Sequence, residues 1–125
     1  MSLRTFGELE ERIMNVLWHR EGPATVRDVH DVLADETPLA YTTVMTVMDR
    51  LWRKGVLERR PRGRAFEYVP VHSEAEHTAT LMHELLSRTR DRRTALAHFV
   101  RGMRRSDEAE LLRLAEDGLS RKRPR

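Results

Sequence analysis

The chain has 125 residues and contains no cysteine. This absence excludes disulfide bonds, thiolate metal sites and catalysis by a cysteine nucleophile. No hydrophobic run approaches the length of about 20 residues that a membrane-spanning helix needs. Charged residues such as Glu8, Glu10 and Arg12 interrupt the N-terminal segment, which therefore lacks the apolar core of a signal peptide. We expect a cytoplasmic protein without membrane insertion.

The sequence also lacks a glycine-rich phosphate loop and a nucleophile placed beside a base. Its five serines all lie near expected helix ends or turns. The six histidines raise the question of a metal site, but His72, His77 and His83 follow at spacings of five and six, which place them on different sides of a helix. We interpret the histidines as scattered surface residues. Neither an enzyme nor a cofactor or metal site is expected.

Positive charge is concentrated in one segment of the chain. The formal net charge is only +3, yet residues 1–40 carry four arginines and eight acids, whereas residues 41–72 carry seven basic residues and three acids. The seven basic residues stand within fifteen positions, as expected of a surface that contacts phosphates. They are Arg50, Arg53, Lys54, Arg59, Arg60, Arg62 and Arg64.

The most informative segment is residues 39–60, LAYTTVMTVMDRLWRKGVLERR. If residues 40–54 are helical, an apolar stripe forms at i, i+3, i+4 and i+7 from Val44, Val47, Met48 and Leu51. The opposite side then carries Thr42, Thr43, Thr46, Arg50 and Arg53. Gly55 would end the helix as its C′ residue. Such a helix can dock on its own domain and offer hydroxyls and guanidinium groups to base edges and phosphates.

A polar helix face has a simpler explanation, because every surface helix needs a solvated side. Solvated faces are usually built from Glu and Lys, which are good helix formers, whereas three β-branched threonines cost helix propensity without packing into a core. The composition of this face therefore favours a nucleic-acid contact. Trp18 and Trp52 each join an apolar stripe, and we interpret both as packing residues.

The surrounding elements predict a winged helix-turn-helix. Residues 6–20 have helical spacing of apolar residues and end at Gly22 and Pro23. Thr25 and Asp28 form a capping-box pattern for a second helix with Val26, Val29, Val32 and Leu33 on its apolar face. After Gly55, residues 56–60 and 65–69 read as two strands joined by a turn at residues 61–64, with basic residues at the tip. The fold class is mainly α with a small β-hairpin wing.

Three further amphipathic helices are expected at residues 75–89, 93–103 and 107–119. After a complete small domain, they can bury their stripes only against one another, against a second copy, or by folding back onto the first domain. We interpret them as a dimerisation domain and keep folding back as the alternative. The expected organisation is residues 1–71 for DNA binding, 72–120 for dimerisation and 121–125 as a basic tail. The dimerisation residues would be Leu81, Leu85, Leu96, Phe99, Val100, Met103, Leu111, Leu112 and Leu114.

Several segments together resemble the penicillinase-repressor family, which includes the BlaI, MecI and copper-repressor types. They are LEERIMNVLW, PATVRDVHDVL, YTTVMTVMDRLWRKGVLERR, FEYVPV and ALAHFV, and the resemblance covers nearly the whole chain. It implies a homodimeric repressor that binds an operator of dyad symmetry, with promoters of β-lactam resistance as the best-known targets. By the resemblance, Thr42, Thr43, Thr46 and Arg50 contact bases and phosphates, Met45 touches a thymine methyl, and the wing arginines grip the backbone.

The resemblance also implies a route of induction. In the best-known members a membrane sensor triggers cutting of the repressor before a phenylalanine in the dimerisation domain. The matching bond here is His98–Phe99, where the family pattern has asparagine in place of the histidine. The copper-responsive members carry paired cysteines near the C-terminus, so copper sensing through thiolates is excluded for this chain.

The sequence thus predicts a homodimeric transcriptional repressor of a β-lactam-resistance or related stress operon, released from DNA by a signal that can include proteolysis near His98–Phe99 through a membrane-sensor protease pathway. The alternative from another functional class is a winged-helix adaptor that binds proteins and has lost sequence-specific DNA binding. The basic wing and the threonine face favour the repressor.

Overall fold

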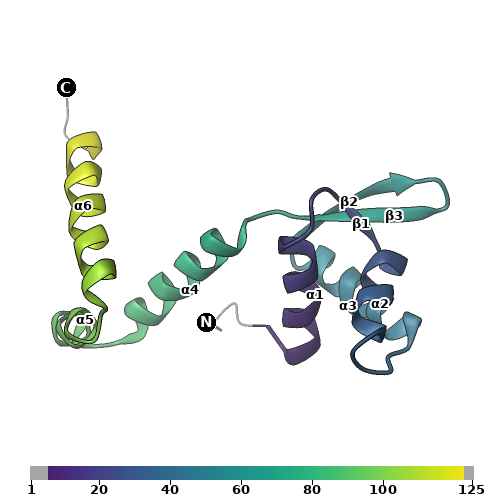
Figure 1. The fold of residues 1–125 in the computed structure, drawn as a ribbon, viewed down its shortest axis with the longest axis horizontal. Coiled ribbons are helices and arrows are strands. Elements are labelled where there is room, and N and C mark those ends of the chain that lie inside the picture. Colours follow the sequence, from purple (N-terminus) through teal and green to yellow (C-terminus); the bar gives the residue numbers. More distant parts are fainter. Residues whose placement is uncertain (1–5, 123–125) are drawn as a thin grey trace. The chain divides into compact units, whose positions relative to one another are not determined.

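The computed structural model describes residues 6–122 of the chain, with side chains described up to residue 118. The chain divides into two compact units, Met1–Met82 and His83–Arg125. The first unit contains three helices, a small sheet and the beginning of a fourth helix (Figure 1). The boundary predicted between DNA-binding and dimerisation domains, near residue 71, remains a prediction about function.

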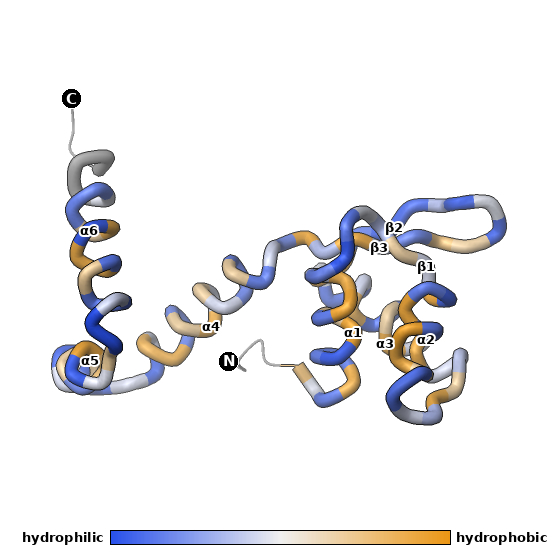
Figure 2. Tube along the Cα trace, in the orientation of Figure 1, coloured by the Kyte–Doolittle hydropathy of each residue, from blue (hydrophilic) through white to orange (hydrophobic). Residues whose placement is uncertain are grey.

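Three helices build the core of the first unit: α1 (Glu8–Trp18), α2 (Val26–Ala34) and α3 (Tyr41–Arg53). The apolar stripe predicted for α3 is confirmed, because Val44, Val47, Met48 and Leu51 are all buried. Figure 2 shows hydrophobic stretches on all three helices. Their buried residues form one cluster with residues of the sheet, which fixes α3 against the domain and leaves its other side exposed.

Two local signals for helix ends are confirmed. The Thr25 hydroxyl accepts from the Asp28 N–H at 3.2 Å, and the Asp28 carboxylate accepts from the Thr25 N–H at 3.0 Å, which is the reciprocal capping box. At the other end of the domain Gly55 has a φ of +80°, the left-handed conformation that ends a helix. These signals set the start of α2 and the exit from α3 into the wing.

The sheet contains three antiparallel strands in the order β1–β3–β2, one more than predicted. They are β1 (Ala24–Thr25), β2 (Leu57–Arg62) and β3 (Ala65–Pro70). The additional strand has only two residues, which pair with Tyr68 and Glu67. A strand this short has no alternation that a sequence pattern can reveal.

The wing hairpin is longer than expected. The sequence pattern predicts a turn at residues 61–64, but Pro61 pairs with Phe66 and Arg62 with Ala65 inside the ladder. Proline is tolerated because β2 is an edge strand. The loop is therefore only Gly63 and Arg64, with Gly63 at a φ of +61° in its first position, as type II′ hairpin turns require.

One position of the predicted apolar stripes and one residue outside them differ from expectation. Val32 on α2 is 45% exposed. It follows Asp31 and precedes the buried Leu33, and neighbouring helix residues point about 100° apart, so it lies beside the buried stripe rather than in it. On α1 the charged residue Glu10 is buried, and its carboxylate is paired with Lys54 at 3.0 Å.

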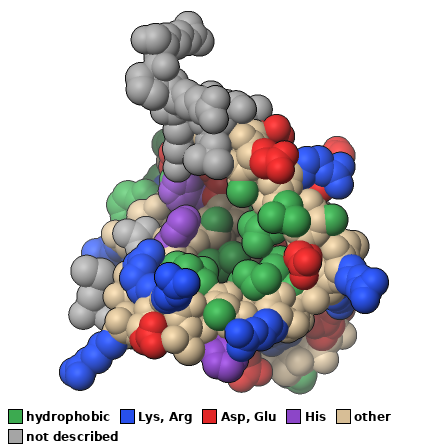
Figure 3. Space-filling view, turned by 90° about the vertical axis from the view of Figure 1, so that its left-hand side faces the viewer, with side chains coloured by type: hydrophobic (Ala, Val, Ile, Leu, Met, Phe, Trp, Pro, Cys, Tyr) green, Lys and Arg blue, Asp and Glu red, His purple; other side chains and the backbone are tan. Residues whose placement is uncertain are grey.

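Three helices follow the wing: α4 (Glu74–Arg88), α5 (Arg92–Arg101) and α6 (Arg105–Lys122). Within the described part of the chain, no side chain of these helices is buried. Figure 3 shows hydrophobic side chains open to the surface between charged ones. These helices thus lack a core of their own.

The start of α4 packs against the first helix. The Trp18 Nε1–H donates to the His72 carbonyl at 3.0 Å, and the His77 ring stacks on Phe6 with a centroid distance of 4.5 Å. Trp18 is half-buried against the core, as expected of a packing residue. These contacts lie inside the first unit, so they join the beginning of α4 to the winged helix.

The basic tail expected at residues 121–125 stays a prediction. Residues 121 and 122 belong to α6, and residues 123–125 lie outside the described residues. Over residues 6–122, no helix is both long and apolar enough to cross a membrane.

Candidate nucleic-acid interface

The outer face of α3 is built as the sequence predicted. Thr42, Thr43, Thr46, Arg50 and Arg53 are all exposed. The Thr46 hydroxyl donates to the Thr42 carbonyl at 2.9 Å, so its proton is used within the helix while its oxygen and methyl group remain open. The face therefore presents acceptors and methyl groups beside cationic side chains, a combination that suits base edges in a major groove.

An acidic residue that the sequence pattern did not reveal lies in the middle of this face. The Asp49 carboxylate accepts from Arg53 Nε at 2.7 Å and from Arg59 Nη1 at 3.1 Å. These bonds hold the pKa of Asp49 below its usual value, and the bond from Arg53 has the largest effect. The i, i+4 spacing of Asp49 and Arg53 was a signal that could have revealed the first pair, but the pair to Arg59 depends on tertiary structure.

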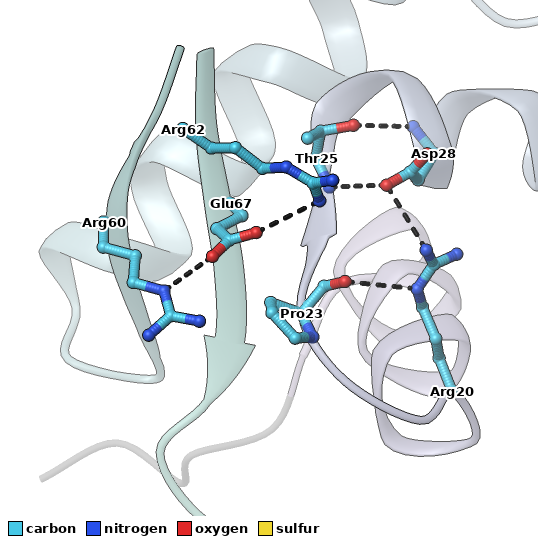
Figure 4. A network of polar contacts seen from close by, with 7 residues as sticks. All are labelled: Arg20, Pro23, Thr25, Asp28, Arg60, Arg62 and Glu67. Atoms are coloured by element: carbon cyan, nitrogen blue, oxygen red, sulfur yellow. Dashed lines mark hydrogen bonds and ion pairs between the residues drawn. The ribbon is translucent and has the colours of Figure 1, made fainter.

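The wing carries its own acidic partner for two of the predicted arginines. Glu67 of β3 accepts from Arg60 Nε at 2.6 Å and from Arg62 Nη1 at 3.3 Å (Figure 4). The side chains of the two arginines remain 72% and 67% exposed, whereas Glu67 is buried. One carboxylate thus holds two guanidinium groups over the outer face of the hairpin, and the trio keeps a net positive charge.

Arg59 differs from the other wing arginines. Its side chain is only 19% exposed, and its guanidinium carbon lies 3.5 Å from the ring centroid of Trp52 and 4.1 Å from that of Phe66. Trp52, which the sequence placed in an apolar stripe, is exposed at 36% and is covered by this arginine rather than by the core. Arg64 lies in the turn and is exposed.

A second polar network supports the base of the wing. Asp28, at the start of α2, receives Arg20 Nη2 at 3.4 Å, and Arg20 Nε donates to the Pro23 carbonyl at 3.4 Å (Figure 4). The bond from the Thr25 N–H is the main reason that the pKa of Asp28 lies below its usual value. Because Thr25 pairs with Glu67 in the sheet, this network fixes β1 beside the strand that holds the wing arginines.

The exit of α3 is tied to α1. Lys54 Nζ lies 3.0 Å from Glu10 Oε2, and Glu10 also accepts from the Gly7 N–H at 3.0 Å. Burial alone would raise the pKa of Glu10, but these two partners outweigh it and the pKa is lowered. Half of the Lys54 side chain remains exposed, so the residue stays at the surface beside Arg50 and Arg53.

These carboxylates predict a loss of stability in acid. A carboxylate whose pKa is lowered in the folded state contributes stability above its unfolded pKa, and this contribution disappears as the pH falls through the folded value. The ordinary pKa of a glutamate is 4.5, and the bonds from Arg60 first and then Arg62 hold the pKa of Glu67 below it. We expect the thermal midpoint of the wild type to decline progressively below that pH, and Glu67→Gln to show a shallower decline, as followed by circular dichroism across a pH series.

The control for this experiment is Glu58→Gln. Glu58 is an exposed glutamate of β2 that forms no ion pair with any described residue. The thermal midpoint of Glu58→Gln should decline with falling pH in the same way as that of the wild type. Identical profiles for Glu67→Gln and the wild type would show that the arginine pair of Glu67 does not stabilise the fold.

The histidines do not come together as ligands. His19 contacts Glu74 at 3.3 Å, His30 Nε2 lies 2.7 Å from the Leu39 carbonyl oxygen, and His77 stacks on Phe6. Among residues 6–118, no group of three His, Asp or Glu side chains is placed to hold a metal ion. Several histidines thus belong to contacts between elements, which sequence spacing alone did not reveal.

The predicted dimerisation residues are placed on α4, α5 and α6. Leu81 and Met103 are half-buried, and the others are at the surface. The exposed members are Leu85, Leu96, Phe99, Val100, Leu111, Leu112 and Leu114, at 39% to 61%. His98 and Phe99, the residues of the predicted cleavage bond, lie inside α5.

Comparison with known proteins agrees with this architecture. The family model of the penicillinase repressor matches residues 6–117. The transcriptional regulator BlaI of Mycobacterium tuberculosis is 44% identical over 116 residues, which are 90% of this chain and 83% of that protein. The penicillinase repressor of Bacillus licheniformis is 27% identical over 81 residues, 65% of this chain and 62% of that protein.

A solved structure covers the first unit. The solution structure of the DNA-binding domain of the repressor BlaI superposes with a TM-score of 0.53 and 25% identity over 60% of this chain and 90% of that domain. Since these relatives are named regulators and repressors, they point to a role other than catalysis. The chain belongs to the penicillinase repressor family and is a BlaI-like transcriptional repressor with a winged-helix DNA-binding fold.

Proposed function

We propose that the protein is a homodimeric repressor that binds a palindromic DNA operator in the cytoplasm. The observation that carries this proposal is the exposed α3 face of threonines and arginines, which stands on a fully buried stripe and continues into an arginine-bearing hairpin. A rigidly held helix with short polar side chains can enter a major groove, and a basic hairpin beside it can reach the adjacent backbone.

In this proposal two sets of residues have different tasks. Thr42, Thr43, Met45, Thr46 and Arg50 face base edges, with the 44% exposed Met45 available to a thymine methyl. The positioning contacts to phosphates come from the end of α3 and from the wing. They involve Arg53, Lys54, Arg60, Arg62 and Arg64.

The proposed dimer follows from the helices without a core. Isolated helices shorter than about 12–15 residues are marginal in water, and α5 has ten residues, none of them buried. Burying the exposed leucines, Phe99 and Val100 against a second copy would supply the missing stabilisation. A two-fold dimer would present two α3 helices to two half-sites, which is why we expect an operator of dyad symmetry.

We further propose that the operator controls a β-lactam-resistance or related stress operon and that induction acts by loss of DNA binding. Support comes from the family and from the position of the predicted cleavage bond. Because His98–Phe99 lies within a helix, a protease of a membrane-sensor pathway could cut it only after α5 opens locally. Because α5 has no buried residues, this local opening costs little free energy.

The alternative function is a protein-binding adaptor without sequence-specific DNA recognition. It would account for the exposed hydrophobic helices equally well. It gives no reason for three exposed threonines on α3 or for arginines held in place at the wing by Glu67. These features favour the repressor.

The readout by α3 can be tested with Thr46→Ala. Each lost base contact should weaken binding to the selected operator by roughly 1–3 kcal/mol, while binding to random DNA should change little. Fluorescence anisotropy titrations with both duplexes measure the two affinities. A matched control is Thr80→Ala, because the Thr80 hydroxyl makes the same bond to a carbonyl four residues earlier, at 3.0 Å, on α4.

Thr80→Ala should leave both affinities at the wild-type value. If Thr46→Ala weakened binding to operator and random DNA equally, Thr46 would be a backbone contact and not a base contact. If it changed neither, α3 would not read the operator at this position.

A further inference from the structure

The four wing arginines do not form one set in the structure. Strand residues alternate between two faces, so Arg59 shares a face with the buried Leu57, while Arg60 lies on the opposite face, across from Glu67. Arg59 pairs across the ladder with the buried Tyr68. This register directs Arg59 toward α3 and away from the outer face of the hairpin.

The guanidinium group of Arg59 is held between one carboxylate and two aromatic rings. Asp49 of α3 receives Nη1 at 3.1 Å, Trp52 of α3 lies under the guanidinium at 3.5 Å and Phe66 of β3 at 4.1 Å. One charged plane thus contacts an acid and a ring from the helix and a ring from the hairpin. The Arg59 side chain is only 19% exposed, so a phosphate has less access to it than to the exposed side chains of Arg60, Arg62 and Arg64.

We propose that Arg59 is a positioning residue that clamps the wing to the recognition helix through Asp49, Trp52 and Phe66, and that it does not contact DNA. The inference rests on the proposed function and deepens it. β1 pairs only with Glu67 and Tyr68, so the distal part of the hairpin extends beyond it. The contact between Arg59 and Phe66 therefore connects this outer part of the wing to α3. With the clamp closed, the exposed wing arginines stay at a fixed offset from the threonines of α3.

The chemistry of arginine gives the test. Lysine keeps the charge but lacks the planar group that can stack on two rings and bind a carboxylate at its edge. Full-length Arg59→Lys and Arg59→Gln would be titrated with operator and random duplexes across a salt series, with Arg60→Gln as a charge-matched neighbour. Arg12→Gln on α1, which loses the same charge, is the control.

We expect Arg59→Lys and Arg59→Gln to weaken binding on both DNAs by about tenfold, the size that loss of cation–π contacts in a dimer allows. Their log-log salt slopes should equal that of the wild type, because no phosphate contact is lost. Arg60→Gln should lower the slope by about 1.8, since about 0.9 is lost for each phosphate contact and a dimer loses two.

Three results would overturn the clamp. A slope reduced by about 1.8 in Arg59→Gln would make Arg59 a phosphate contact like its neighbours. Wild-type affinity in Arg59→Lys would show that charge alone suffices. A folded Arg59→Gln with unchanged affinity but a lower thermal midpoint would make the cluster a packing element only.

Hydrogen exchange tests the clamp without DNA and so separates it from the proposed function. If the wild type bound no duplex, the repressor proposal would fail, yet amides of the distal hairpin, residues 62–66, should still exchange faster in Arg59→Gln than in Arg60→Gln. Equal exchange in the two variants would contradict the clamp whatever the DNA titrations show.

Discussion

Replacing Leu96 and Phe99 with glutamate should turn the protein into a monomer and lower its affinity for a palindromic operator by about 100-fold to 10,000-fold. Both side chains are exposed on α5, at 44% and 51%, on a helix without buried residues. When two linked modules bind one duplex, the second contact is effectively intramolecular, and losing that link removes an avidity of about this size. Sedimentation velocity gives the oligomeric state and anisotropy titration the affinity.

A control for this variant is Arg93→Glu, which adds an acid to the exposed surface of the same helix. It should remain dimeric and retain most of its affinity. A wild-type chain that sediments as a monomer at micromolar concentration would refute the dimer, and with it the reason to expect a symmetric operator. A monomeric double variant with unchanged operator affinity would separate dimerisation from DNA binding.

Removing Arg62 and Arg64 together should lower the log-log salt slope of DNA binding by about 3.6, because each arginine accounts for about 0.9 per protomer. The effect should be nearly equal on operator and random DNA, since phosphate contacts position the protein without reading sequence. Glu67 remains paired with Arg60 in this variant, so the buried carboxylate does not lose its only partner. Titration of both duplexes across a salt series measures the slopes.

Arg12→Ala serves as the control for charge. Arg12 contacts Glu36 at 3.6 Å and belongs to α1, not to α3 or the wing. Its removal should leave the slope within error of the wild type. An unchanged slope in the double variant would mean that the wing tip does not touch the duplex, and that Arg53 and Lys54 at the end of α3 supply the electrostatic attraction.

The sequence was sufficient where local periodicity and local hydrogen bonds decide the structure. The stripe of Val44, Val47, Met48 and Leu51 and the capping pair of Thr25 and Asp28 are found as predicted. In each case the interacting groups lie within a few residues of one another. The order of three helices and a hairpin, and thus the winged helix, follows from these local signals.

The sequence was insufficient where the structure depends on register and distant partners. Periodicity cannot show that Glu67 receives two arginines, because this requires β3 to pair with β2 in one register. Nor can it separate Arg59 from Arg60, since alternation assigns them to opposite faces without saying which face meets α3. The two-residue strand β1 could not be predicted for the same reason, because it exists only through its pairing with Tyr68 and Glu67.

We expect two copies of α3 and the wing to read a symmetric DNA site. Selection of bound duplexes from a random library by the full-length chain, followed by sequencing, tests it most directly. We predict enrichment of one inverted repeat with half-sites separated by one helical turn or a multiple of it, about 10–10.5 base pairs from centre to centre, and loss of that enrichment in Thr46→Ala. Recovery of unenriched random sequences, or of one asymmetric site unaffected by Thr46→Ala, would contradict the account.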